Sequence, residues 1–385
     1  MPPQKIFEVP FLLAIGMLAI MFFSVILPML ILPRIVPQIT TDAHPESRWL
    51  DGLRGIASAI VALNHAPLVI INLQVTPKVF GYKGKALELF NFTGSIGVQI
   101  FFCITGMLFA RKILMSEQID WTDFFRKRMR RIVPAYFFAC SVALSIAAWY
   151  SWPVTQPLTK ILASIPSVLS FGLMPLPTIN GFDFGRLLGV NWTLAIEWRY
   201  YLTLPLVFVL IRDHRHLAIA FLVLFAILDS TITGSSSWVY FVSGAICAPM
   251  MKRQFSDKTR AWGLATLFST MLLYALFWRK FPNYGYERWL LMTVLFASIV
   301  VVRPGVLSKR PIVAMGTVSY SFYLLHCLVL FFIFEFARIH LFDVSNMDVL
   351  SFTMMTGGTL AIATILSTAT YVFIERPFMY AKKTL

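Results

Sequence analysis

The fold class that the sequence predicts is all-α: a polytopic integral membrane helix bundle of about eleven transmembrane helices. The 385 residues are 58% hydrophobic and only 13% charged, and their mean hydropathy is +0.74. Soluble domains carry about 25% charged residues. Apolar runs of about 20 residues, the length that crosses a bilayer as a helix, recur along most of the chain. No long linker and no internal repeat divides these runs, so we expect one membrane domain.

The expected spans follow the apolar runs in chain order. The first is too long for a signal peptide and lacks its charged start and cleavage site, so we expect it to be retained. Two connections are long, 111–131 and 151–190. The apolar stretch 161–173 of the second either re-enters the membrane or forms an interfacial flap. Spans are expected near 10–32, 52–71, 94–110, 132–150, 192–211, 217–230, 235–250, 262–278, 287–303, 312–336 and 350–373.

The net charge of +15 is explained by membrane topology. With the N-terminus outside and the C-terminus in the cytoplasm, most of the 33 Lys and Arg residues fall on the cytoplasmic side, as the positive-inside rule requires. We therefore expect a multi-pass protein of the inner (cytoplasmic) membrane in contact with membrane lipids. Nucleic acid is not an expected partner.

The four cysteines, Cys103, Cys140, Cys247 and Cys327, all fall within expected spans. None has metal-site spacing, and none lies where an extracytoplasmic disulfide would form. We expect small buried hydrophobic residues and no metal. Walker A, H-E-x-x-H and G-x-S-x-G motifs are missing from the sequence, so metal-dependent catalysis and serine hydrolase chemistry lack support.

Arg54 and His65 are the most informative pair, because eleven residues turn a helix almost three times and leave both side chains on one face. They would lie about 16 Å apart along that face. Ionisable groups inside a bilayer are costly and are functional candidates. The alternative is an Arg at the lipid headgroups and a His bonded to a neighbouring helix.

Arg128 and Arg131 lie in a strongly basic segment just before the expected span 132–150. Three residues apart, they share a helix face, and two forked guanidiniums suit phosphate recognition. The alternative is a topology determinant that touches anionic lipid.

Three further groups of polar residues lie in the expected spans. Glu197 is three and four residues before Tyr200 and Tyr201, so both hydroxyls can reach its surroundings, although an ion pair with Arg199 is the alternative. Tyr323 and His326 are neighbours on one helix face, and a packing role is the alternative for His326. In 375–377, ERP, we expect a helix-end ion pair followed by a helix-stopping proline.

Together these segments resemble the membrane-bound acyltransferase family 3, over most of the chain from about residue 49 to about residue 379. Any one of these motifs alone is weak evidence for the family. The whole set, in order and on separate helices, is specific. The pieces are LDGLRG (50–55) with His65 eleven residues after Arg54, GVQIFF (97–102), Arg128 and Arg131 before IVPAY (132–136), WTLAIE (192–197), SYSFYLLH (319–326) and ERP (375–377).

The resemblance implies a ten-helix core, a cytoplasmic acyl-coenzyme A donor, with acetyl expected, and a sugar hydroxyl as acceptor. Residues 1–48 would add a helix and connector before an acyltransferase membrane domain at 49–385. Some members carry a C-terminal hydrolase domain. This chain ends soon after Pro377, so we expect the membrane domain to act alone or with a separate partner.

The resemblance places the family's essential Arg and His at Arg54 and His65, and its basic motif at Arg128 and Arg131. The three arginines would hold the phosphates of acyl-coenzyme A, whose thin arm would run along the Arg54–His65 face. His65 would act as general base or form an acyl-histidine. The acceptor would be a surface or exported glycan or a lipid-linked sugar.

Supporting roles are expected for four residues. Glu197 would orient His65 or bind the acceptor, as a second catalytic residue. Asp51, Tyr323 and His326 are candidate supporting residues. The alternative to an enzyme is a proton-coupled transporter or flippase of an anionic amphiphile. Intramembrane His, Glu and Arg would serve such a protein equally well. The sequence carries no signal of oligomeric state.

Overall fold

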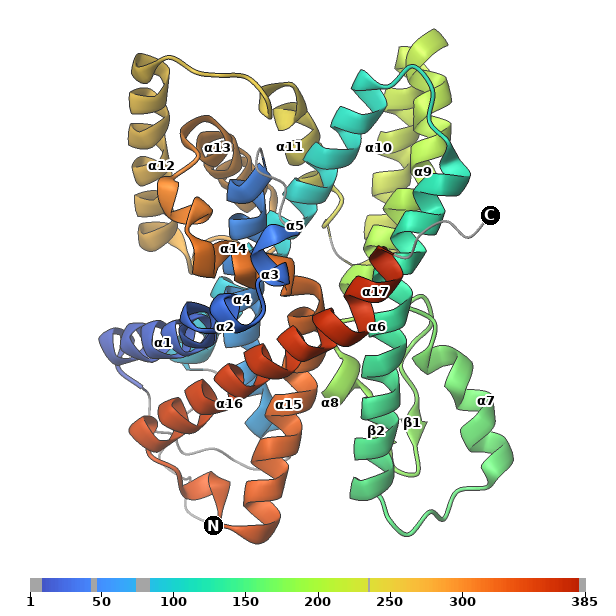
Figure 1. Ribbon diagram of the computed structural model, residues 1–385, viewed down its shortest axis with the longest axis vertical. Coiled ribbons are helices and arrows are strands. Elements are labelled where there is room, and N and C mark those ends of the chain that lie inside the picture. The colour runs from blue at the N-terminus through green and yellow to red at the C-terminus, as the bar shows by residue number, and fades with distance from the viewer. Residues whose placement is uncertain (1–8, 43–46, 74–83, 235, 381–385) are drawn as a thin grey trace.

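The computed structural model describes residues 9–42, 47–73, 84–234 and 236–380 (Figure 1). They form a helical bundle with one two-residue antiparallel hairpin, which confirms the all-α class. The helices are α1 (Phe11–Ile26), α2 (Leu32–Ile35), α3 (Gln38–Thr41), α4 (Arg48–Asn72), α5 (Lys85–Met115), α6 (Trp121–Tyr150), α7 (Leu158–Val168), α8 (Gly185–Leu188), α9 (Trp192–Asp213), α10 (Arg215–Thr233), α11 (Val239–Cys247), α12 (Asp257–Phe277), α13 (Tyr286–Val302), α14 (Arg310–Thr317), α15 (Ser319–His340), α16 (Val349–Thr370) and α17 (Arg376–Met379), and the strands are β1 (Thr178–Ile179) and β2 (Phe182–Asp183).

Seven helical stretches of the described residues are long and apolar enough to cross a membrane. The expected spans at 52–71, 217–230, 235–250 and 287–303 are not among these stretches and are represented by α4, α10, α11 and α13, of which α11 has only nine residues. The multi-pass architecture is therefore confirmed, and the count of eleven stays a prediction. The seven stretches are Phe11–Ile35, Lys85–Met115, Trp121–Tyr150, Trp192–Asp213, Asp257–Phe277, Ser319–His340 and Val349–Met379.

Helices α4 and α5 form the centre of the bundle and pack closely on each other. A Cβ at Gly97 of α5 would lie 2.6 Å from Cγ2 of Val61 and 2.6 Å from the carbonyl oxygen of Ala57. Small residues allow helix backbones to approach this closely, which is the usual basis of helix association in membranes. Larger side chains at position 97 would separate the two helices that carry much of the candidate site.

The expected span 312–336 is wrong as a single helix. The chain bends at Val318, where α14 ends and α15 begins, and Val318 itself has φ −89° and ψ 3°. The cause is packing: Gly316 lies so close to α4 that a Cβ there would be 1.8 Å from the carbonyl oxygen of Asp51. The chain turns after this contact, and α15 starts in a new direction.

The N-terminal segment packs on the C-terminal part of the chain. In Figure 1, α1 and α16 run across the bundle, and the two helices contact each other. The Thr364 hydroxyl donates to the carbonyl of Val25 at 3.1 Å, and Arg376 donates to Asp42 at 2.8 Å. Residues 1–8 and 43–46 lie outside the described residues, and the proposed boundary between 1–48 and 49–385 stays a prediction.

The long connection 151–190 contains α7, the β1–β2 hairpin and α8. Helix α7 stands at the edge of the molecule in Figure 1, and most of its residues are exposed. Its buried end, Val168, accepts a hydrogen bond from the Tyr136 hydroxyl of α6 at 2.7 Å. The choice between an interfacial flap and a re-entrant segment stays open, because α7 satisfies its backbone hydrogen bonds as a helix in either place.

The expectation that the four cysteines are buried and form no disulfide is confirmed. Cys103, Cys140, Cys247 and Cys327 are all buried and free of disulfide bonds.

Candidate functional site

A small cavity of about 90 Å³ lies where α4, α5, α6, α9 and α15 meet. We call it the arginine cavity, because Arg54, Arg128 and Arg131 all line it. The three arginines singled out from the sequence are thus brought together from two helices. The other lining residues are Val98, Phe101, Phe102, Thr105, Phe109, Ile132, Thr193, Leu194, Glu197, Tyr201, Ser319, Tyr320 and Tyr323.

The arginine cavity has an excess of positive charge. Arg54 contacts Asp51 at 3.6 Å, and Arg131 contacts Glu375 at 4.0 Å, so both ion pairs are long. The guanidinium of Arg128 lies over the Phe109 ring at 5.4 Å, and its Nε is buried without a hydrogen-bond partner among the described residues. Buried donors that lack a protein acceptor are costly, and a bound anion would satisfy them.

Glu197 also lines the arginine cavity. Its carboxylate accepts hydrogen bonds from Tyr201 at 3.0 Å and from Thr105 of α5 at 3.3 Å. The alternative of an ion pair with Arg199 is wrong, because Arg199 pairs instead with Asp229 of α10 at 3.0 Å. Sequence reasoning found the Tyr201 contact, which is local to one helix, and missed Thr105 and Asp229, which are on other helices.

The helix-end ion pair expected in 375–377 is also wrong. Glu375 is fully buried and accepts a hydrogen bond from Ser321 at 2.8 Å, besides facing Arg131. Arg376 turns away to Asp42, and the helix continues past Pro377 after a π-helical turn at Tyr371–Glu375. Adjacent side chains on a helix point about 100° apart, so Glu375 and Arg376 reach different partners.

Tyr323 and His326 of α15 lie beside the arginine cavity. The Tyr323 hydroxyl is 2.8 Å from the Thr193 hydroxyl and donates to the carbonyl of Val190 at 3.0 Å, which fixes the ring in the cavity wall. The His326 ring is fully buried, and its centroid lies 6.0 Å from that of Tyr323. His326 is therefore the next side chain behind the cavity wall.

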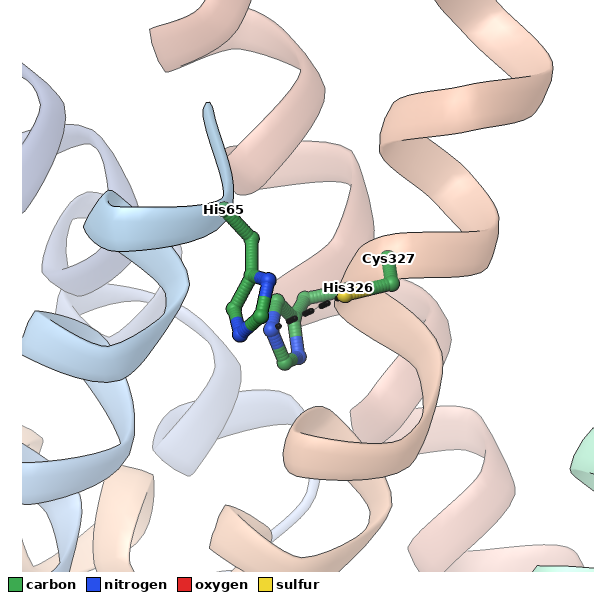
Figure 2. Close-up of side chains that lie close together, drawn as sticks. All are labelled: His65, His326 and Cys327. Carbon is green, nitrogen blue, oxygen red and sulfur yellow. Dashed lines mark hydrogen bonds between the residues drawn. The ribbon is translucent and has the colours of Figure 1, made fainter. Parts of the chain in front are cut away.

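His65 and His326 face each other from α4 and α15, as Figure 2 shows, with ring centroids 5.1 Å apart. The Nδ1 of His326 is 3.0 Å from the carbonyl oxygen of Phe322. A carbonyl only accepts, so Nδ1 carries the proton in the neutral ring, and Nε2 keeps its lone pair. The two histidines, far apart in sequence, form a contact that no helical spacing predicts.

His65 opens onto a second cavity of about 230 Å³, which we call the histidine cavity. It lies between α4, α15 and the short helix α8, and Arg186 of α8 is the one charged residue among the described residues that line it. Sequence reasoning missed Arg186, because the 151–190 connection has no periodic pattern to read. The lining residues are His65, Leu68, Gly185, Arg186, Gly189, Cys327 and Leu330.

The two cavities are separate. Ser58 and Val61, which lie between Arg54 and His65 on the shared face of α4, are buried, and Gly97 of α5 packs on Val61. The expected path for a thin substrate along this face is therefore filled by α5. Tyr323 and His326 stand between the arginine cavity and His65 instead.

The comparisons with known proteins agree on one family. A sequence model described as an acyltransferase domain, of acyltransferase family 3, matches residues 47–368. The chain is 26% identical over 376 residues to the membrane-bound transacylase BcsY of Komagataeibacter xylinus, covering 88% of this chain and 85% of BcsY. It is 27% identical over 285 residues to the O-acetyltransferase OatA of Staphylococcus aureus, covering 62% of this chain and 46% of OatA, so it spans less than half of that relative. No solved structure matches the chain.

Proposed function

Since this chain belongs to the membrane-bound acyltransferase family 3 and is a multi-pass membrane acyltransferase, we propose that it moves an acetyl group from acetyl-coenzyme A to a hydroxyl of a surface or exported glycan. The observation that carries this proposal is the pair of cavities, one positively charged and one lined by His65, with Tyr323 and His326 between them. A transporter is not favoured, because the family is enzymatic.

The donor binds at the arginine cavity. Its volume of about 90 Å³ suits a phosphate group or a thin chain and is too small for the whole of coenzyme A. The phosphates therefore bind to Arg54, Arg128 and Arg131 at the mouth, and the thioester end extends inward. Charge-assisted bonds from forked guanidiniums are the strongest contacts that a protein offers to phosphate.

The acceptor binds at the histidine cavity. Gly185 and Gly189 have no side chains to cover their backbone at the wall of this cavity. Backbone groups and the Arg186 side chain offer hydrogen bonds to hydroxyl groups without requiring a charged ligand. A neutral sugar fits this chemistry better than a nucleotide does.

The chemical step joins the two cavities at His65. The glycan hydroxyl oxygen attacks the thioester carbonyl carbon while His65 takes the hydroxyl proton. The carbon–sulfur bond then breaks, the coenzyme A thiolate leaves, and the proton held by His65 neutralises it. His326 is a positioning residue: its ring packs against the His65 ring with centroids 5.1 Å apart, and its Nδ1–H is held by the Phe322 carbonyl. The thioester reaches His65 past Tyr323, since α5 fills the direct path.

The proposed orientation puts the arginine cavity toward the cytoplasm and the 151–190 connection outside, in the inner membrane, with the C-terminus cytoplasmic. In a protein whose native cysteines are replaced, Thr159→Cys in α7 is then labelled by an impermeant thiol reagent on intact cells, and Lys258→Cys is not. Both positions are exposed, so both react after permeabilisation. Labelling of position 258 alone in intact cells would reverse the orientation.

The test of the function is release of free coenzyme A from acetyl-coenzyme A by purified protein in detergent, with and without a glycan fraction of the cell envelope. We expect release that the glycan accelerates, and incorporation of labelled acetyl into the glycan. Intact acetyl-coenzyme A after incubation of well-folded protein, with the glycan present, would contradict the proposal.

A further inference from the structure

We infer that His65, His326 and Cys327 form a binding site for a soft divalent transition metal, with zinc the best match, and that an occupied site stops acyl transfer. The inhibition rests on the proposed role of His65, and the metal site itself does not. The ligand atoms of the three residues all lie within 4.8 Å of one another (Figure 2). They come from α4 and α15, two helices that pack together.

The ligand set selects the metal. Two imidazoles and a thiolate suit zinc and other soft divalent ions, whereas calcium and magnesium require oxygen ligands. Of the residues that line the histidine cavity, none is a carboxylate. His326 Nε2 lies 3.4 Å from Cys327 Sγ. Tetrahedral zinc with bonds of about 2.0–2.3 Å holds its ligand atoms roughly 3.3–3.6 Å apart, so this pair is already spaced for the metal. Since the three ligand atoms lie within 4.8 Å, no pair needs to shorten by more than about 1.5 Å.

The surroundings of His326 prepare it to be a ligand. Its Nδ1–H donates to the Phe322 carbonyl at 3.0 Å, which directs the Nε2 lone pair toward the cluster. Metal-binding histidines in proteins commonly donate their second N–H in this way, and the contact fixes both tautomer and ring orientation. When no metal is bound, the Nε2 lone pair contacts the Cys327 thiol, which is a weak hydrogen-bond donor.

Access comes from the histidine cavity, because His65 and Cys327 both line it. Three protein ligands leave the fourth position of a tetrahedral ion open toward the cavity, where water completes the shell. Arg186 also lines the cavity and repels a cation. The thiol therefore has to bind as the thiolate, releasing its proton to solvent, which lowers the charge of the bound unit to +1.

Metal binding and acyl transfer exclude each other at His65. A metal bound to one His65 nitrogen leaves the proton of the neutral ring on the other nitrogen, so neither nitrogen is free to take the proton of the acceptor hydroxyl. The metal also occupies the wall of the cavity that the acceptor enters. The site is thus an inhibitory switch on the proposed reaction.

The first experiment measures the metal without any substrate. Reduced full-length protein in detergent is titrated with Co²⁺, whose thiolate complexes show a sulfur-to-cobalt charge-transfer band. We expect one equivalent to give this band, Cys327→Ser to abolish it, and Cys140→Ser to keep it. Cys140 is the matched control, because it is buried but contacts Val168 of α7 instead of the cluster. No band in the wild type, or an equal band in Cys327→Ser, would overturn the site.

The second experiment measures zinc inhibition of coenzyme A release. Each variant is compared with its own metal-free rate. We expect Cys327→Ser to need at least about tenfold more zinc for half inhibition, since even outer partners of a metal commonly change affinity tenfold or more. Equal zinc sensitivity of the two proteins would overturn the switch. A cobalt band in protein that never turns over would instead refute the proposed function and leave the metal site standing.

Discussion

The arginine cavity and the histidine cavity lie on the two sides of Tyr323 and His326, and they differ in almost every property that decides what binds. Among the described residues, three guanidiniums line the arginine cavity against the one carboxylate of Glu197. The described lining of the histidine cavity has one charged residue, Arg186. Under the proposed function, the first site takes an anion, and the second takes a neutral ligand beside a titratable base.

Under the proposed function, the difference means that one helix, α4, serves two substrates and keeps them apart. Helix α4 contributes Arg54 to the first cavity and His65 to the second, and tight packing of Gly97 on Val61 closes the face between them. Water and acceptor entering the histidine cavity are thereby kept from the phosphate site. Changes at the two ends of α4 should have separable effects on binding and on chemistry.

The largest effect is expected for His65→Ala. Loss of a general base typically lowers the rate by about 10²–10⁴-fold. Donor affinity should stay near that of the wild type, because His65 lines only the acceptor side. Coenzyme A release and acetyl-coenzyme A binding, measured on one preparation, check both statements. His340→Ala, near the far end of α15 against Phe336, is the control and should change neither. A His65→Ala protein that transfers within a few-fold of the wild type would remove His65 from the chemistry.

The next largest effect is expected for Arg128→Ala combined with Arg131→Ala. Hydrogen bonds to charged groups contribute about 1.5–3 kcal/mol each, so donor affinity should fall at least about tenfold. A pantetheine thioester without the nucleotide should lose much less, because it lacks the phosphates.

The matched control for this pair is Arg126→Ala with Lys127→Ala. It removes the same charge from the same helix, but both side chains are exposed and outside the cavity. We expect near-normal affinity. Equal losses for the full donor and the pantetheine thioester, or for the two double variants, would show that Arg128 and Arg131 do not recognise phosphate.

Contacts within one helix could be predicted from the sequence, and contacts between distant helices could not. Helical spacing brought Arg128 near Arg131, Glu197 near Tyr201 and Tyr323 near His326, and the structure has each of these neighbours. The apolar runs likewise predicted the membrane bundle. These features depend on the helical repeat alone.

The partners from other helices depend on packing, which the repeat does not encode. His65 against His326, Arg199 with Asp229 and Glu375 with Arg131 each join segments far apart in the chain. The break at Val318 has the same origin, since the approach of Gly316 to α4 ends α14 there. Local patterns therefore predicted one helix over 312–336 where there are two. They also suggested neighbouring partners for Glu197 and Glu375 that the structure does not have.

A smaller effect is expected for Glu197→Gln. The carboxylate opposes the three arginines, so its removal should raise affinity for the anionic donor on the order of a few-fold. The amide keeps the size and an acceptor oxygen for Tyr201 or Thr105. Donor titration and transfer rate are measured together. A large loss of transfer with unchanged donor affinity would assign Glu197 to the chemistry at His65 instead.

The smallest effect on either cavity is expected for Asp229→Asn. Asp229 pairs with Arg199 away from both cavities, and its side chain is 2% exposed. Breaking a buried ion pair from one side typically costs about 3–5 kcal/mol of stability. The melting temperature should fall, while donor affinity and transfer per folded molecule stay normal. A normal melting temperature combined with impaired transfer would mean that this pair, too, belongs to the functional site.

The most direct test of the two-cavity account is an experimental structure with a non-hydrolysable acetyl-coenzyme A analogue bound. The account predicts phosphate density within hydrogen-bonding distance of Arg128 and Arg131, with the thioester end directed past Tyr323 toward His65. Phosphates bound beside Arg186, in the histidine cavity, would contradict the account.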